Sequence, residues 1–262
     1  MEAKGESIKL TPQQQRVLKL LFKFRFVSAQ SLAIVMSIRR ASVYEVLEYL
    51  VKQELITKVY KSEWRIDRRP AYYYLTKSGV TTVRKIMDVK EPVVHALYKN
   101  EDASEEFIQH SLVALGCYNA LKPHLPEDSE IFTKAEINRF RQFPKNRPDL
   151  YIRTPSGQEA IIIILDDKPP YIIRKRLDEI ITHSEDEGWD NDTYPHICFI
   201  LKDDYSKNSF LYGAHKKLES MGMDEEEIRI LATSLKLVKE DAQIVWSDAL
   251  NPHKPVSLFS ID

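Results

Sequence analysis

Apolar residues recur at helical spacing in the first part of the chain and gather in short continuous runs in the second part. The helical spacing predicts three short helices near the beginning. The first starts at Thr11, a favourable N-cap residue, with Pro12 at its first position. The second covers residues 28–36, and the third covers residues 39–53 after a tight turn.

Two strand-like segments follow these helices. Residues 55–60 and 71–75 are rich in β-branched and aromatic residues and flank a charged segment, which predicts a β-hairpin. A further helix is expected to begin at residues 76–79. Three helices followed by a hairpin are typical of a winged helix-turn-helix. We expect this domain to cover residues 8–90.

The second part of the chain alternates strands with helices, which predicts an α/β layered domain. A helix over residues 104–121 is expected to open it. In the hairpin that follows, residues 149–152 and the apolar run 161–165 lie on either side of a turn at residues 155–157. The apolar run predicts a strand buried on both faces. Helices and strands then alternate at residues 172–183, 197–201, 207–221 and 228–232.

The two parts of the chain carry opposite net charges. Residues 1–90 hold 18 Lys and Arg and 8 Asp and Glu, a net charge of about +10. The other residues hold 20 Lys and Arg and 31 Asp and Glu, and the whole chain has a net charge of −1. A basic first domain is typical of a nucleic-acid-binding surface. Ordinary solvated surfaces are the alternative. The domains are expected to be joined by a linker at residues 91–103, with the second covering residues 104–262.

Basic and aromatic residues gather where a winged helix meets DNA. The third helix is expected to enter the major groove, and the tip of the hairpin suits phosphate and groove contacts. The predicted DNA-binding residues are Arg39, Arg40, Ser42 and Tyr44 of the helix, and Lys61, Trp64, Arg65, Arg68 and Arg69 of the tip. A winged helix that docks another protein is the alternative.

Acidic residues stand at the ends of the second hairpin. Asp149 opens one strand, and Asp166, Asp167 and Lys168 follow the other. Carboxylate oxygens suit a hard cation such as Mg²⁺ or Mn²⁺, which polarises a phosphate and activates water. Strand side chains repeat with period two, so Asp166 and Lys168 are expected to share a face, whereas Asp167 offers only its carbonyl. A solvated exit from a buried hairpin is the alternative.

Two further residues are candidates for the same site. Glu136 lies thirteen residues before Asp149, where a carboxylate would complete a metal site. A surface glutamate in an ion pair is the alternative. His110 lies on the predicted helix 104–121, and a neutral imidazole suits proton transfer near neutral pH. A structural histidine is the alternative.

Composition limits the class of protein. There is no apolar run of 18 residues, so no membrane span is expected. Residues 1–7 lack the apolar core of a signal peptide. Cys117 and Cys198 lie far apart among apolar residues, which predicts buried thiols in a reducing cytoplasm.

The acidic hairpin resembles the PD-(D/E)xK nuclease superfamily, whose motif matches residues 148–149 and 166–168. The expected fold is therefore α+β or α/β, with a winged helix before a restriction-endonuclease-like mixed sheet. The order of elements over roughly residues 10–250, which ends with Trp246, resembles the replication-relaxation family, including MobC-type mobilisation relaxases. The resemblance implies that Asp149, Asp166 and Lys168 are catalytic, with Glu136 and His110 as further members.

The resemblance implies a metal-dependent endonuclease that nicks one strand at a transfer or replication origin of a plasmid or mobile element. Double-stranded DNA, relaxosome or coupling proteins and a second copy of the chain are the implied partners. The chain departs from the family pattern, in which many members have glutamate at Asp166 and arginine at Lys168. Its seven histidines do not cluster, which argues against tyrosine chemistry with a histidine-held metal. A catalytically inactive DNA-binding regulator or replication accessory, and a double-strand endonuclease, are the alternatives.

Overall fold

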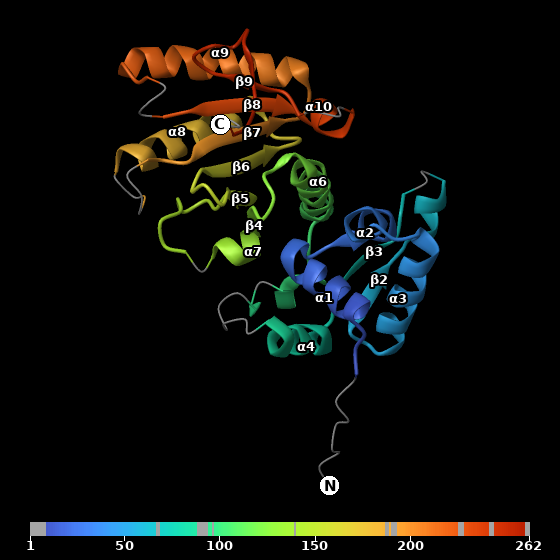
Figure 1. Ribbon diagram of the computed structural model, residues 1–262. Coiled ribbons are helices and arrows are strands. Elements are labelled where there is room, and N and C mark those ends of the chain that lie inside the picture. The colour runs from blue at the N-terminus through green and yellow to red at the C-terminus, as the bar shows by residue number, and fades with distance from the viewer. Residues whose placement is uncertain are drawn as a thin grey trace. The chain divides into compact units, whose positions relative to one another are not determined.

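The chain forms two compact units, Met1–Leu112 and Val113–Asp262, in a computed structural model (Figure 1). The residues that it describes are 9–66, 69–87, 94–95, 97–138, 140–186, 189, 193–224, 228–240 and 244–259. The division falls inside helix α6 (Glu105–Leu121), whose first turns belong to the first unit. Residues 91–93 and 96 of the expected linker lie outside the described residues.

Local hydrogen bonds explain where the first helices begin. In α1 (Pro12–Phe24), the Thr11 side chain accepts from the Gln14 backbone N–H, and the Gln14 side chain accepts from the Thr11 N–H. This reciprocal capping box satisfies N–H groups that a helix start leaves without partners. Ser28 caps α2 (Ala29–Met36) in the same way through Ser31. The predicted helix starts are confirmed.

The first unit has the topology of a winged helix. Helix α3 (Arg40–Lys52) follows α2 and precedes the antiparallel hairpin of β2 (Ile56–Val59) and β3 (Tyr72–Leu75). The short strand β1 (Val27–Ser28) pairs with β3, giving the order β1-β3-β2. Helices α4 (Lys77–Met87) and η2 (Leu97–Lys99) follow. The winged-helix prediction is confirmed.

A seven-stranded sheet forms the centre of the second unit, within the described residues. Its order is β10-β9-β8-β7-β6-β5-β4. Strands β4, β5 and β6 pair antiparallel, and β6, β7 and β8 pair parallel. Strand β9 pairs antiparallel with β8 on one side and with β10 on the other. The strands are β4 (Glu130–Thr133), β5 (Leu150–Arg153), β6 (Glu159–Leu165), β7 (His196–Leu201), β8 (Ile230–Ser234), β9 (Trp246–Asp248) and β10 (Pro255–Val256).

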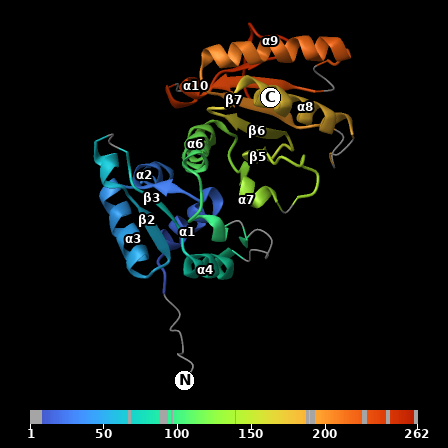
Figure 2. The ribbon, with the colours of Figure 1, turned by 180° about the vertical axis from the view of Figure 1, so that it is seen from behind.

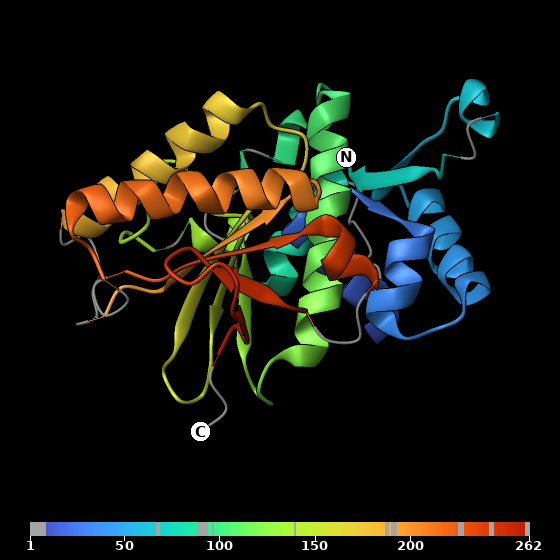
Figure 3. The same cartoon turned by 90° about the horizontal axis from the view of Figure 1, so that it is seen from above.

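Two long helices cover one face of this sheet. Helices α8 (Pro170–Glu185) and α9 (Asp204–Met221) lie side by side over one face, as Figures 1 and 3 show. Their apolar side chains, including Leu177 of α8 and Leu211 of α9, pack into one buried core with the strands. Helices α7 (Lys134–Ile137) and α10 (Leu235–Glu240) connect β4 to β5 and β8 to β9, and the 3₁₀ helix η3 (Lys122–His124) lies between α6 and β4.

The predicted order of hairpin, helix and strand is present. Strands β5 and β6 form the hairpin, α8 crosses the sheet, and β7 returns parallel to β6 (Figure 2). Every residue of β6 is buried, as the apolar run predicted. The chain is therefore a winged helix followed by a mixed α/β unit. Among the described helices, none is long and apolar enough to span a bilayer.

Candidate functional site

The start of α3 presents basic side chains to solvent. Arg39 is its N-cap residue and Arg40 its first residue, and both are exposed. The Arg40 Nη2 atom donates to the Tyr44 hydroxyl at 2.9 Å, and its guanidinium lies 5.5 Å from the centre of that ring. Ser42 is half-buried. The opposite face of the helix is anchored in the core by Val43, Val46, Leu47 and Leu50.

The tip of the β2–β3 hairpin is the second basic surface. A short 3₁₀ turn, η1 (Ser62–Arg65), forms part of it, and Lys61, Arg65 and Arg69 are exposed. Arg69 also pairs with Glu105 at 3.5 Å. The predicted DNA-binding residue Arg68 lies outside the described residues.

The structure corrects the prediction for Trp64. Its side chain is only 6% exposed, and it belongs to a buried cluster with Phe26, Tyr72 and Tyr74. The ring centres of Trp64 and Tyr72 are 5.0 Å apart. The indole therefore stabilises the hairpin from inside instead of offering its face to DNA. A run of charged residues around a tryptophan did not reveal this, because the aromatic partners come from other segments.

In the second unit, Asp149 lies immediately before β5 and is 9% exposed. Its backbone N–H donates to the Ile162 carbonyl at 2.9 Å, although Leu150 is the residue paired with Ile162. Two successive residues thus face one residue of β6, which is the arrangement of a β-bulge. The Asp149 carboxylate accepts from the Ile164 N–H at 2.8 Å. The backbone of β6 therefore holds this carboxylate in place.

The acidic segment after β6 differs from the prediction in one respect. Strand β6 ends at Leu165, and Asp166 and Asp167 form a turn. The period-two argument that placed Asp166 and Lys168 on one strand face is therefore wrong, because the strand does not continue. Both residues are half-buried. The exposed carboxylate of Asp167 bonds to the Lys202 ammonium at 2.8 Å, so it turns toward the end of β7.

Asp149 and Asp166 both act on one buried group, the thiol of Cys117 on α6. Burial is the largest cause that raises the pKa of this thiol, and the negative charges of the two aspartates contribute to its value of about 12. Lys239 of α10 acts in the opposite direction. Two carboxylates that are distant in sequence therefore exert their charge on one buried sulfur atom. The expected burial of Cys117 and Cys198 is confirmed.

Glu136 has a structural role at the start of α7. Its Oε2 atom accepts from the Thr133 N–H at 2.9 Å and from the Thr133 hydroxyl at 3.1 Å, which caps α7. The spacing of Thr133 and Glu136 is that of a capping box. His110 lies half-buried on α6 in the first unit, whereas the aspartates belong to the second. Its catalytic role stays a prediction.

The side chains that are available as ligands limit which cation the acidic hairpin would hold. Within the residues that the structure describes, no group of three or more His, Cys, Asp or Glu side chains is placed to hold a metal ion. A side-chain cage of Asp149, Asp166 and Asp167 is therefore not formed there. Mg²⁺ usually takes one or two protein carboxylates and fills its other positions with water and phosphate oxygens. Asp149 and Asp166 offer carboxylates of that type and number.

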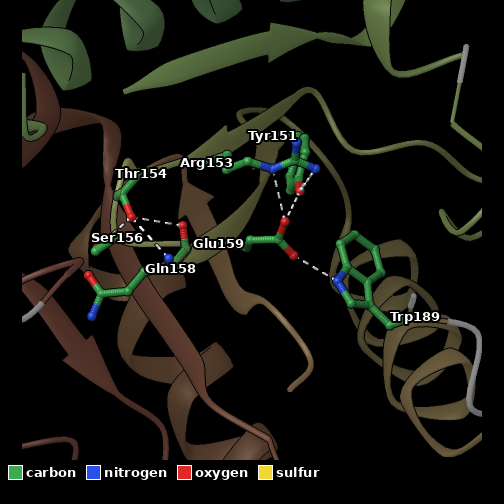
Figure 4. Close-up of polar contacts among 7 residues, drawn as sticks. All are labelled: Tyr151, Arg153, Thr154, Ser156, Gln158, Glu159 and Trp189. Carbon is green, nitrogen blue, oxygen red and sulfur yellow. Dashed lines mark hydrogen bonds and ion pairs between the residues drawn. The ribbon is translucent and has the colours of Figure 1, made fainter. Parts of the chain in front are cut away.

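The sequence did not reveal a buried polar cluster in the same unit, which Figure 4 shows. Glu159, 8% exposed, accepts from the Tyr151 hydroxyl, from Arg153 Nε at 3.1 Å and from Trp189 Nε1 at 2.8 Å. Burial and the neighbouring Glu159 raise the pKa of Tyr151. Trp189 in turn packs against Phe143, whose segment leads to Asp149. The cluster thus supports the chain that carries the aspartate.

The chain was compared with known proteins. No protein-family model matches it, and no curated protein does. Among solved structures it is similar to the adhesin competence repressor AdcR from Streptococcus pyogenes, with 20% identity and a TM-score of 0.27 over 39% of this chain and 74% of that chain. A MepR-like protein complexed with pseudoligands has 26% identity and a TM-score of 0.28 over 41% and 78%.

A mutant MarR from E. coli complexed with operator DNA has 17% identity and a TM-score of 0.28, over 45% of this chain and 77% of that chain. TM-scores of this size do not define a shared family. The winged-helix assignment therefore rests on the element order and strand pairing of this chain.

Proposed function

We propose that this protein binds duplex DNA through its winged helix. The observation that carries the proposal is the placement of exposed cations on both elements with which a winged helix contacts DNA. Arg39 and Arg40 lie at the start of α3, and Lys61 and Arg65 lie at the hairpin tip. Such groups bind phosphates and release counterions. The net charge of about +10 for residues 1–90 adds long-range attraction.

The test is the salt dependence of binding to a fluorescent 30-base-pair duplex of mixed sequence. Replacing both Arg39 and Arg40 by alanine removes two cations, so the slope of log affinity against log salt should fall by about two. Lys77→Ala, an exposed lysine of α4, is the matched control and should leave the slope unchanged. Salt-independent or absent binding by the unchanged chain would refute the proposal.

A second candidate function is metal-dependent cleavage of the bound DNA. The observation that favours it is that Asp149 directly precedes β5 and Asp166 directly follows its antiparallel partner β6, so both lie at the same end of this hairpin. Mg²⁺ or Mn²⁺ held by the two carboxylates would polarise a phosphate and lower the pKa of water. Asp149 is already oriented by its hydrogen bond to Ile164, and Lys168 would supply a further positive charge to the phosphate.

Under this second proposal, the protein is an endonuclease that nicks the origin of a plasmid or mobile element. Supercoiled plasmid carrying its own origin is the substrate for the test, with and without a chelator. Open-circular product that requires the divalent cation supports nicking, whereas linear product indicates a double-strand endonuclease. Tight binding without cleavage under any divalent cation would leave the DNA-binding regulator or replication accessory as the function.

A further inference from the structure

The hairpin tip carries an apolar side chain in full contact with solvent. Ile66 is 85% exposed, and it directly follows the exposed Arg65. Isolated apolar residues are common on protein surfaces and need no explanation by themselves. What distinguishes Ile66 is the way in which the surrounding turn holds it away from the domain.

A closed turn, anchored from inside, presents Ile66. The Ile66 N–H donates to the Glu63 carbonyl at 3.1 Å, and the Trp64 N–H donates to the Lys61 carbonyl at 3.0 Å. The Arg69 N–H returns to the Trp64 carbonyl at 2.9 Å. The indole of Trp64 lies in the core, so the turn cannot rotate to bury Ile66 without removing Trp64 from its aromatic partners.

Exposed cations share the turn with the isoleucine. Lys61 and Arg65 are exposed on the same turn, and the Lys61 ammonium lies 5.8 Å from the centre of the Trp64 ring. Glu63 on this turn is acidic, Asp67 follows Ile66 in the sequence but lies outside the described residues, and Arg69 is paired with Glu105. An apolar side chain that shares a turn with two exposed cations has the chemistry of a surface that reads a groove, where phosphates line the walls and base edges form the floor.

We propose that Ile66 acts as an apolar wedge that enters a groove of duplex DNA and presses against a base step, while Lys61 and Arg65 bind the flanking phosphates. This inference rests on the proposed DNA binding and adds a contact that reads bases instead of phosphates. Inserted Ile, Leu or Met side chains partly unstack base pairs and kink the duplex. The fixed turn limits the entropy lost on insertion, because the side chain is already held outward.

The first test separates apolar from electrostatic contacts in the full-length protein. Ile66→Ala should weaken binding to the 30-base-pair duplex by about tenfold without changing the salt slope, because no phosphate contact is lost. Arg65→Ala should lower that slope by about one. Ile66→Leu should retain the affinity. Thermal unfolding should be the same for every Ile66 variant, since the side chain is exposed.

The second test measures unwinding. Relaxed closed-circular plasmid is incubated with the protein and a metal-independent topoisomerase in the presence of a chelator, so no cleavage of the proposed kind interferes. The unchanged chain and Ile66→Leu should leave supercoils after protein is removed, and Ile66→Ala should not. Equal affinity and equal unwinding by Ile66→Ala would overturn the wedge.

Two other outcomes also test the proposed wedge. If Ile66→Ala abolishes self-association in sedimentation but leaves DNA binding intact, the occupant is a second copy, and the wedge is overturned while the DNA-binding function stands. If the unchanged chain does not bind the duplex at all, the proposed function fails and the wedge fails with it.

Discussion

The carboxylate of Asp149 accepts a hydrogen bond from the backbone N–H of Ile164 at 2.8 Å. Strand β5 begins one residue later, at Leu150, so its backbone does not reach this part of β6. The side chain takes the place of a backbone partner for a buried N–H group. Asp149 therefore has a structural role that is independent of any chemistry, and experiments on it must separate the two.

The variants Asp149→Asn and Asp149→Ala distinguish the structural role of Asp149 from a catalytic role. The asparagine retains an oxygen acceptor, so we expect little change in the free energy of unfolding. The alanine leaves the buried Ile164 N–H without a partner, which costs about 1–3 kcal/mol. If the carboxylate holds a cation, both variants lose plasmid nicking. Urea unfolding and the plasmid assay measure the two effects, and nicking that survives in Asp149→Asn would rule out the catalytic role.

Gly79 packs against backbone in the first unit. A Cβ at this position would lie 1.9 Å from the Leu55 carbonyl oxygen, which cannot move freely because it accepts from the Thr76 N–H. Gly79→Ala should therefore lower the free energy of unfolding by more than about 2 kcal/mol through overpacking. Gly213→Ala on α9 is the control, because its Cβ would meet no atom within 4 Å. That variant should be neutral or more stable by up to about 1 kcal/mol.

Glu159 is the shared acceptor of the buried polar cluster. Glu159→Leu would leave the Tyr151 hydroxyl and the Trp189 N–H without their acceptor, with an expected loss of about 3–5 kcal/mol in unfolding free energy. Release of Trp189 should shift its fluorescence toward longer wavelength. Trp189→Phe identifies that signal, because Trp64 and Trp246 are also present and both are buried. An unshifted spectrum would show that the hydrogen bond does not hold Trp189 in place.

His196 gives the second unit a dependence on pH. Burial lowers the pKa of His196, while its hydrogen bond to the Leu258 carbonyl, 3.0 Å away, opposes the shift. Arg229 lowers this pKa and Asp248 raises it. Because an unfolded histidine has a pKa of about 6.5, the unfolded chain binds more protons as the pH falls below that value. The free energy of unfolding should therefore decrease on acidification below about pH 6.5.

His196→Asn tests the assignment, because an amide N–H can replace the imidazole donor but does not titrate. The decrease in unfolding free energy between about pH 7.5 and pH 5.5 should be smaller in this variant than in the unchanged chain. A remaining decrease is expected, since burial also lowers the pKa of His183. An identical decrease in both proteins would show that His196 does not contribute.

Features that depend on neighbours in sequence were predictable. Thr11 and Pro12 start α1, and the apolar run in β6 forms a buried strand, because capping bonds and burial on both faces leave local signatures. The same local rule identifies Glu136 as a capping residue of α7, a role that the predicted metal ligation at this position did not include. Local patterns thus located the winged helix and the acidic hairpin.

Contacts between distant segments decided the rest. Trp64 is buried because it packs with Tyr72 and Phe26, and the charges of Asp149 and Asp166 both act on Cys117, which lies on a different element. The sequence alone determined which segments form helices and strands and which residues carry charge. The tertiary structure decided where each side chain points, because packing between segments, and not spacing along the chain, sets which groups are buried and which groups share a site.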